Sequence, residues 1–401
     1  FIISFLLLLF SCSLDTKSGF WSDQKEIKNE TKLLKKVFKK EKILKKEFNP
    51  TLSIKLSSKV KDNNYQNNTN NNTGRINFVG QPKKISKFKF SKIDNFSYFE
   101  PELIFHNQNL IFFDDKSSII KFDKTSKIIW KKNFYSKSER KLKPILNFGK
   151  IKDTLIITDN ISKYYAININ NGELIWSHYN SSPFNSQIKI YDDKFLVVDF
   201  KNILRCFSIK DGKELWNIKS GDTFLKSGKR LSLIVVNNLV YFNNSFGDII
   251  AIDINTGERV WETPTQNSSI YENAFFLKTS DLIANQKAIL FSNNKNEFYS
   301  LDLKTGILNW KQKINSYLRS TIINDLIFSV SNEGYLFVMD FSTGKILRAT
   351  DVFDHLSKKK RKEIFPEGFI VGIKEIYITT SNGKLLIVDI SSGKTVSVLK
   401  I

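Results

Sequence analysis

Apolar and polar residues alternate along most of this chain in blocks that recur with a nearly constant period. One block, Gly247–Trp261 (GDIIAIDINTGERVW), predicts a buried strand, a tight turn at Asn255–Gly257 and a second strand carrying a tryptophan. The first strand is apolar on both faces, and glycine provides the positive φ that a tight turn requires. Six further copies of this block are Ser117–Trp130, Ser162–Trp176, Lys201–Trp216, Asn296–Trp310, Gly334–Arg348 and Gly383–Ser397.

The spacing of these blocks predicts the fold class. Tryptophans 130, 176, 216, 261 and 310 stand 46, 40, 45 and 49 residues apart. Each block follows an apolar run that ends in Asn, Asp or Ser in most copies, and each unit has room for one earlier strand. A period of about 40–50 residues with four short strands per unit is typical of a β-propeller. We therefore predict an all-β propeller of four-stranded antiparallel blades over residues 84–401. The apolar runs are Leu110–Asp115, Thr154–Asp159, Lys194–Phe200, Leu239–Asn244, Ala288–Asn293, Leu326–Ser331 and Glu375–Thr380.

Two columns of the repeat have structural explanations. An Asp or Asn before the turn can accept hydrogen bonds from nearby backbone N–H groups, so we interpret these carboxylates as turn caps and not as catalytic pairs. A recurring tryptophan buries a large apolar area and can dock on the neighbouring blade. The acidic or amide column is Asp123, Asn168, Asp253, Asp302, Asp340 and Asp389.

The N-terminal part has a different composition. Phe1–Leu9 is almost wholly apolar and too short to span a bilayer, so residues 1–11 are predicted to be a fragmentary signal peptide. Residues 12–83 are rich in Lys and Asn and are predicted to be a flexible tether, with the low-complexity stretch 63–73 as linker. Apolar residues within 15–50 recur at intervals close to three and four, so a basic amphipathic helix is an equally open interpretation.

Charge does not change this interpretation. The formal net charge is +22, but Lys and Asn are abundant throughout the chain, which indicates a general compositional bias, and no nucleic-acid partner is predicted. The three histidines, His106, His178 and His355, lie in different repeats without metal-ligand spacing. The sequence therefore predicts no metal site.

The repeated pattern A-x-D-x-x-T-G-x-x-x-W resembles the PQQ-like propeller repeats, which occur in two families. Quinoprotein dehydrogenases bind pyrroloquinoline quinone and carry an adjacent pair of cysteines over it. This chain has only Cys12 and Cys206, so no such pair exists. The run Leu9-Phe10-Ser11-Cys12 resembles a lipobox, and Cys12 followed by a tether and propeller repeats resembles the BamB lipoprotein family. We therefore expect no cofactor and no enzymatic activity, with a periplasmic PQQ-dependent dehydrogenase as the alternative.

Membership of the BamB family would imply further properties. Cys12 would be acylated, and because Ser13 is not Asp, the protein would lie at the periplasmic face of the outer membrane. It would be a scaffold that assists insertion of β-barrel proteins, with a BamA-like barrel-assembly protein and unfolded outer-membrane proteins as partners. The family also implies eight blades, the count that we favour, with Lys84–Lys92 completing a last blade whose inner strands would follow Ile401. A seven-bladed ring closed by Thr395–Ile401 is the alternative.

One loop is the predicted partner contact. Gly221–Arg230 (GDTFLKSGKR) follows Trp216 and lies outside the strand pattern. Phe224 and Leu225, beside Lys226 and Arg230, resemble an exposed interface hot spot. The alternative is that Phe224 packs beneath its own blade.

Overall fold

The predicted propeller repeats form seven antiparallel sheets. The computed structural model describes residues 48–49, 51–56, 71–76, 82, 87–89, 93, 101–221, 229–265 and 277–401. The predicted signal peptide, Cys12 and most of the predicted tether lie outside these residues. Among the described residues, no helix combines the length and apolar character needed to cross a membrane. The two described helices, both short, are α4 (Lys137–Lys141) and α5 (Lys358–Arg361).

Every sheet contains four strands paired in chain order. The first two sheets contain β1 (Ile104–His106), β2 (Asn109–Phe113), β3 (Ile119–Phe122), β4 (Ile128–Lys132), β5 (Leu146–Ile151), β6 (Thr154–Asp159), β7 (Lys163–Asn168) and β8 (Leu174–Tyr179). The next two contain β9 (Lys189–Tyr191), β10 (Lys194–Val198), β11 (Ile203–Ser208), β12 (Glu214–Lys219), β13 (Leu233–Val236), β14 (Leu239–Asn243), β15 (Ile249–Asp253) and β16 (Arg259–Thr263).

The last three sheets complete the series. They contain β17 (Ile283–Ala284), β18 (Ala288–Asn293), β19 (Glu297–Asp302), β20 (Leu308–Gln312), β21 (Thr321–Ile323), β22 (Leu326–Val330), β23 (Tyr335–Asp340), β24 (Ile346–Asp351), β25 (Pro366–Val371), β26 (Glu375–Thr380), β27 (Lys384–Asp389) and β28 (Thr395–Lys400). The predicted second strands at 154–159, 288–293 and 375–380 coincide with β6, β18 and β26.

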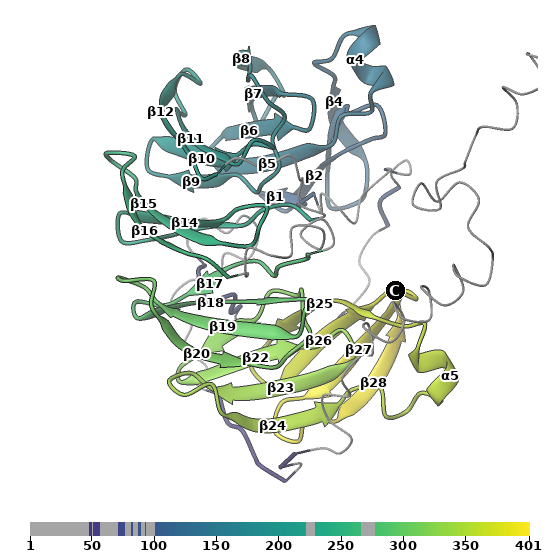
Figure 1. Ribbon diagram of the computed structural model, residues 1–401. Coiled ribbons are helices and arrows are strands. Elements are labelled where there is room, and N and C mark those ends of the chain that lie inside the picture. The colour runs from purple at the N-terminus through teal and green to yellow at the C-terminus, as the bar shows by residue number, and fades with distance from the viewer. Residues whose placement is uncertain are drawn as a thin grey trace, which may run out of the picture. The chain divides into compact units, whose positions relative to one another are not determined.

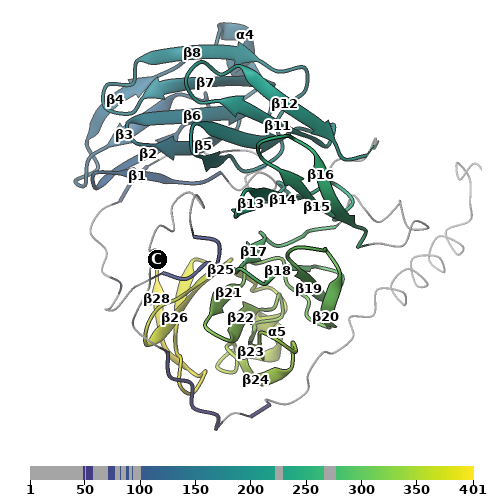
Figure 2. The ribbon, with the colours of Figure 1, turned by 90° about the vertical axis from the view of Figure 1, so that its left-hand side faces the viewer.

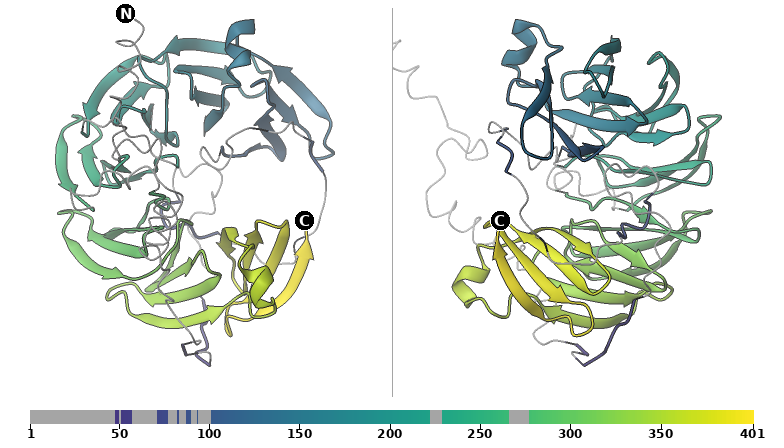
Figure 3. Two further views of the ribbon diagram at one scale, coloured as in Figure 1. Left: turned by 45° about the vertical axis from the view of Figure 1, so that its right-hand side comes forward. Right: turned by 180° about the vertical axis from the view of Figure 1, so that it is seen from behind.

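The sheets follow one another around a common centre, as Figures 1 and 3 show. Contacts between first strands link consecutive sheets: β5 contacts β9, β9 contacts β13, β13 contacts β17, and β17 contacts β21. The first strand of each sheet is therefore the inner one, and the fourth lies at the rim. This arrangement confirms the predicted propeller of four-stranded blades.

The preference for eight blades is not confirmed. The described residues form seven four-stranded sheets, and no such sheet stands between β25–β28 and β1–β4 in Figures 2 and 3. Lys87–Lys89, which belong to the strand predicted to complete the last blade, form no strand. Phe88 instead packs against the first sheet, with its ring centroid 5.5 Å from that of Phe122.

The repeated tryptophan joins each blade to the next. Trp261 on β16 lies opposite the small residue Ala251 of β15, directly before a β-bulge. Its indole Nε1 donates to the carbonyl of Leu303 in the next blade, 3.2 Å away, and its ring covers the turn glycine Gly306. Four other blades repeat this contact, through Trp130, Trp176, Trp216 and Trp310. The predicted docking of the tryptophans on neighbouring blades is confirmed.

The turn-capping column is also confirmed. The carboxylate of Asp253 accepts hydrogen bonds from the backbone N–H groups of Asn255 and Thr256, and Asp302 accepts from Lys304 and Thr305 in the same way. These carboxylates lie at the rim and fix the turns that bring each glycine beneath a tryptophan. They are structural groups.

In the degenerate sixth repeat an arginine occupies the tryptophan position. Arg348 on β24 is fully buried, and its guanidinium donates to the carbonyls of Ile390 and Ser391 in the last blade at 2.9 and 2.7 Å. The same group donates to the carbonyl of Leu52 at 3.0 Å. Burial lowers the pKa of Arg348.

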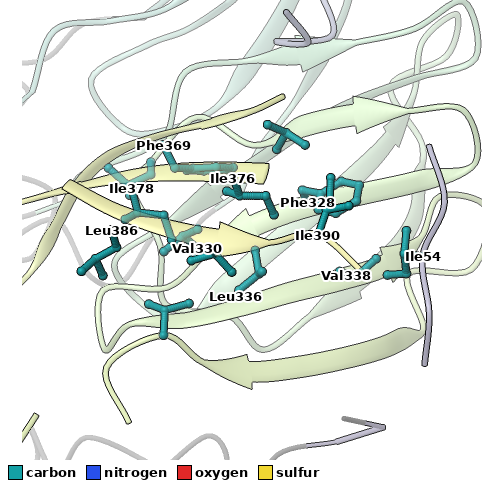
Figure 4. Packing of buried hydrophobic residues seen from close by; sticks show 14 of the residues in the cluster. Ile54, Phe328, Val330, Leu336, Val338, Phe369, Ile376, Ile378, Leu386 and Ile390 are labelled. Atoms are coloured by element: carbon teal, nitrogen blue, oxygen red, sulfur yellow. The ribbon is translucent and has the colours of Figure 1, made fainter. Parts of the chain in front are cut away.

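The Leu52 contact belongs to an N-terminal segment that lies along the rim. Phe48 and Ala349 of β24 exchange two backbone hydrogen bonds of 3.0 Å, and the segment is the purple trace beside β24 in Figure 1. Ile54, from the same segment, packs into the core between the last two sheets, near Val338 (Figure 4). Part of the predicted tether is therefore attached to the propeller.

Candidate functional site

The predicted partner loop connects β12 to β13. Residues 222–228, and with them Phe224, Leu225 and Lys226, lie outside the described residues. The flanking residues are anchored: the Ser220 hydroxyl donates to the carbonyl of Asn202 at 2.9 Å, and Lys229 Nζ donates to the carbonyl of Tyr317 at 3.1 Å. Both ends of the loop therefore start from fixed positions on the propeller.

Arg230, the fourth residue of the predicted partner contact, is buried. Only 7% of Arg230 is exposed, because its guanidinium lies between two carboxylates. The guanidinium nitrogens stand 3.4 Å from Glu102 Oε1 and 3.3 Å from Asp281 Oδ2. The sequence pattern missed this because neither carboxylate is close to Arg230 along the chain.

These three residues belong to a polar cluster at the inner ends of the blades, which we call the central cluster: Glu102, Gln187, Lys189, Arg230, Asp281 and Arg319. Glu102, Gln187, Asp281 and Arg319 each stand two residues before the first strand of a sheet, and Arg230 stands three residues before one. Inner strands converge on the propeller axis, so side chains at this register meet although they come from five blades. An alignment of the repeats by their first strands would have revealed this column.

The charges of the central cluster depend on one another. Burial raises the pKa of Glu102, and Arg230 offsets this only in part. Burial alone would also raise the pKa of Asp281, but Arg230, Lys229 and Arg319 hold it below its ordinary value. Gln187 Nε2 donates to both carboxylates, at 3.3 Å to Glu102 and 3.0 Å to Asp281. The cluster is a paired network in which the cations stabilise Asp281 as a carboxylate.

The geometry of the central cluster does not suit a calcium ion beside a quinone. Calcium takes six to eight oxygen ligands, whereas Glu102 and Asp281 both face the guanidinium of Arg230. Among the described residues, no group of three or more His, Cys, Asp or Glu side chains is placed to hold a metal. Cys206 is buried on β11, and burial raises the pKa of its thiol to about 12, so it is a packed residue and not a nucleophile.

A short segment of the predicted linker lies against this cluster. The carbonyl of Asn72 accepts from the backbone N–H of Ala284 at 2.9 Å, and that of Thr73 accepts from Ile322 N–H at 2.8 Å. Arg319 donates to the carbonyl of Asn71 at 2.6 Å. The linker prediction is therefore wrong for residues 71–73: they bury polar groups through hydrogen bonds, which a pattern based on apolar residues does not reveal.

A second surface feature lies at the rim. Large apolar side chains are exposed on the outer strands, or directly before an outer strand, and each lies shortly before a tryptophan. Between 48% and 67% of the surface of each residue is accessible. Isolated exposed apolar residues are common, but a recurring set on one class of strand favours contact with other macromolecules. We call these residues the outer-strand apolar set: Ile128, Ile129, Leu174, Ile175, Leu215, Val260, Ile307 and Leu308.

Comparisons with known proteins agree with the propeller. The sequence model of a family described as outer membrane protein assembly factor BamB matches residues 115–350. The chain is similar to outer membrane protein assembly factor BamB of Legionella pneumophila, with 24% identity over 206 residues, which are 49% of this chain and 48% of that protein. The chain thus spans about half the length of this curated relative.

Two solved structures share the fold. The crystal structure of BamB from Moraxella catarrhalis matches with a TM-score of 0.60 and 15% identity, over 76% of this chain and 88% of that one. A europium-containing methanol dehydrogenase matches with a TM-score of 0.58 and 11% identity, over 75% of this chain and 78% of that one. At such identities the likeness shows the fold alone, and the two structures do not separate a scaffold from a dehydrogenase.

Proposed function

This chain belongs to the family of the outer membrane protein assembly factor BamB, and we propose that it is a non-enzymatic scaffold assisting insertion of β-barrel proteins into the outer membrane. The observation that carries the proposal is the match of residues 115–350 to that family. The central cluster supports it, because the carboxylates that a calcium–quinone site would need are engaged by Arg230.

The proposed partner is a BamA-like barrel-assembly protein, bound through the loop at residues 221–230. Loops held at both ends by a rigid scaffold are common binding elements, and this loop is fixed through Ser220 and Lys229. Phe224, Leu225 and Lys226 are the proposed contact residues. Arg230 acts by holding the loop end against Glu102 and Asp281.

Unfolded outer-membrane proteins are proposed as further partners, at the outer-strand apolar set. Extended chains of such proteins alternate apolar and polar residues. The fourth strands present exposed apolar side chains together with edge backbone groups that can pair with a strand.

Cys12 is proposed to carry the lipid that holds the protein at the periplasmic face of the outer membrane. The support is the resemblance of Leu9–Cys12 to a lipobox. Several acyl chains would give stable attachment, since each buried methylene contributes about 0.8 kcal/mol.

Capture of the purified barrel-assembly protein tests the proposal. Phe224→Ala with Leu225→Ala should raise the Kd, because hot-spot truncations cost about 2 kcal/mol or more each, roughly thirtyfold per residue. The matched control is Leu174→Ala with Ile175→Ala, which removes a comparable exposed apolar pair from the rim.

The control should capture the barrel-assembly protein normally and bind an unfolded outer-membrane protein less well. Both variants should melt at the wild-type temperature. If the loop variant melts early and its capture falls only in step with unfolding, Phe224 is a core residue and the proposed interface is wrong.

A further inference from the structure

We propose that the inner ends of β13, β17 and β21 form a binding site for a short peptide that contains a turn, which the chain's own residues Asn71–Ile76 occupy. The site would accept a segment of another protein with the same pattern, Asn-x-x-Gly-Arg. This inference goes beyond the assembly role and does not depend on it.

Contacts to the backbone of three different blades hold the segment. The side chain of Asn72 donates to the carbonyl of Val235 on β13 at 2.6 Å, while its carbonyl accepts from Ala284 N–H on β17 at 2.9 Å. The carbonyl of Thr73 accepts from Ile322 N–H on β21 at 2.8 Å. Recognition of a peptide through main-chain hydrogen bonds to strands is a recurring mode of binding. The inner strands thus offer backbone groups that a peptide from another chain could pair with equally well.

The first position of the pattern Asn-x-x-Gly-Arg requires asparagine because of the contacts of its side chain. Asn71 is buried, and its Oδ1 accepts from Gly74 N–H at 3.0 Å while its Nδ2 donates to the carbonyl of Arg75 at 2.7 Å. The side chain of Asn71 therefore closes a turn in the bound peptide. Arg319, two residues before β21, donates to the Asn71 carbonyl and ties this turn to the central cluster.

The fourth position requires glycine for two reasons. Gly74 has a φ of +75°, in the left-handed region that residues with a side chain rarely adopt. A Cβ at this position would stand 2.9 Å from the carbonyl oxygen of Ser320. A side chain there would clash with backbone that cannot easily move, so any larger residue should expel the segment.

Because the chain's own residues 71–76 already lie in the site, a peptide from another protein would have to compete with them. A segment on the same chain acts at an effective concentration of about 1 mM. A separate peptide with a Kd of 0.1 mM would then bind the occupied protein about tenfold more weakly than the protein with its own segment expelled. The residues in contact, Asn, Asn, Thr and Gly, bury little apolar surface, which fits an exchangeable ligand.

The test uses the full chain with Gly74→Val, and Gly383→Val is the matched control. Gly383 has a φ of +71° but no atom within 4 Å of the added Cβ, so it reproduces the backbone strain without the clash. The first readout is trypsin cleavage after Arg75, which is 7% exposed in the bound segment. The second is fluorescence anisotropy of a labelled, N-acetylated peptide of residues 71–76.

We expect trypsin to spare Arg75 in the wild type and in Gly383→Val and to cleave it rapidly in Gly74→Val. The labelled peptide should bind Gly74→Val at least tenfold more tightly than the wild type or the control. If Gly74→Val is poorly folded by circular dichroism, Asn71→Ala replaces it, because that change removes no atom from any strand.

Two results would overturn the proposal. Cleavage at Arg75 without gain of peptide binding means that the segment is only an intramolecular contact. Protection of Arg75 in both Gly74→Val and Asn71→Ala means that neither the space at Gly74 nor the turn closed by Asn71 governs binding of the segment, so the site does not recognise the pattern Asn-x-x-Gly-Arg. Neither readout involves an assembly partner, so both are independent of the proposed scaffold role.

Discussion

The contact between a tryptophan and the turn glycine of the next blade makes a quantitative prediction for Gly306→Ala. Gly306 has a φ of +72°, and an added Cβ would stand 2.5 Å from Cε3 of Trp261 and 2.7 Å from the hydroxyl of Thr263. The indole cannot easily retreat, since its Nε1 donates to the Leu303 carbonyl. Gly383→Ala is the matched control, because Gly383 shares the φ but meets no atom within 4 Å.

The two substitutions separate backbone strain from packing. A left-handed residue with a side chain costs about 1–2 kcal/mol, and both variants should lose this amount of unfolding free energy. Inserting a methyl group into a close-packed contact costs a further 1–3 kcal/mol or so, and only Gly306→Ala should lose it. We therefore expect Gly306→Ala to be about 2–5 kcal/mol less stable than the wild type, and Gly383→Ala about 1–2 kcal/mol less stable.

Equilibrium unfolding in urea, followed by far-UV circular dichroism, measures both losses. In a Trp261→Ala background the clash with the indole is gone and only the contact with the Thr263 hydroxyl remains, so Gly306→Ala should cost less than in the wild-type background and approach the strain of about 1–2 kcal/mol. Equal losses for the two glycine variants in the wild-type background would refute the reasoning. The Trp–Gly contact would then hold the repeats in register without contributing to their packing energy.

Four further results are expected. Trp261→Ala alone should lose about 3–5 kcal/mol of unfolding free energy in the same urea titration, because it empties a large buried site. Burial raises the pKa of Asp159 to about 6, above the unfolded value near 4, so the contribution of this carboxyl group to stability falls as the pH rises from about 4 to 6. Asp159→Asn should therefore remove that part of the pH dependence of the melting temperature. Cys12→Ser should abolish labelling with a radioactive fatty acid and release the protein from outer membranes; a wild-type protein that takes up no label would contradict the proposed anchor. Purified protein given pyrroloquinoline quinone and Ca²⁺ should retain no quinone after desalting and reduce no dye with alcohols or sugars; stoichiometric retention would favour a dehydrogenase.

Local patterns predicted the blades well because each strand and turn is specified by nearby residues. The Asp253 turn, for example, needs only a carboxylate and a glycine four residues later, both in one short block. Trp261 could be assigned to the blade interface because its position relative to that turn is fixed. What repeats along the sequence also repeats in the structure.

The central cluster and the segment 71–76 that lies against it are held together by residues far apart in sequence. The repeat pattern of the sequence did not reveal them. Arg230 appeared to belong to an exposed loop because its partners, Glu102 and Asp281, lie in other repeats. Asn71 appeared to be linker because amides in low-complexity stretches are usually solvated, yet here it closes a buried turn. In both cases contacts with residues far away in the sequence decide the outcome, Glu102 and Asp281 for Arg230 and Arg319 for Asn71, and periodicity carries no information about them.

Arg348 shows how a departure from the repeat changes the tether as well as the blade. A tryptophan at this position could donate a single hydrogen bond, whereas Arg348 donates to the last blade and also to the carbonyl of Leu52. Together with the Phe48–Ala349 pairing, the hydrogen bond from Arg348 to Leu52 attaches the chain to the rim at residue 48. The sequence instead predicts that the propeller starts at residue 84. If Cys12 carries the proposed lipid, 36 residues separate lipid and propeller, and a chain spans at most about 3.3–3.6 Å per residue. The attachment at β24 could then lie no more than about 120–130 Å from the membrane, half the reach that the predicted tether of 72 residues would allow.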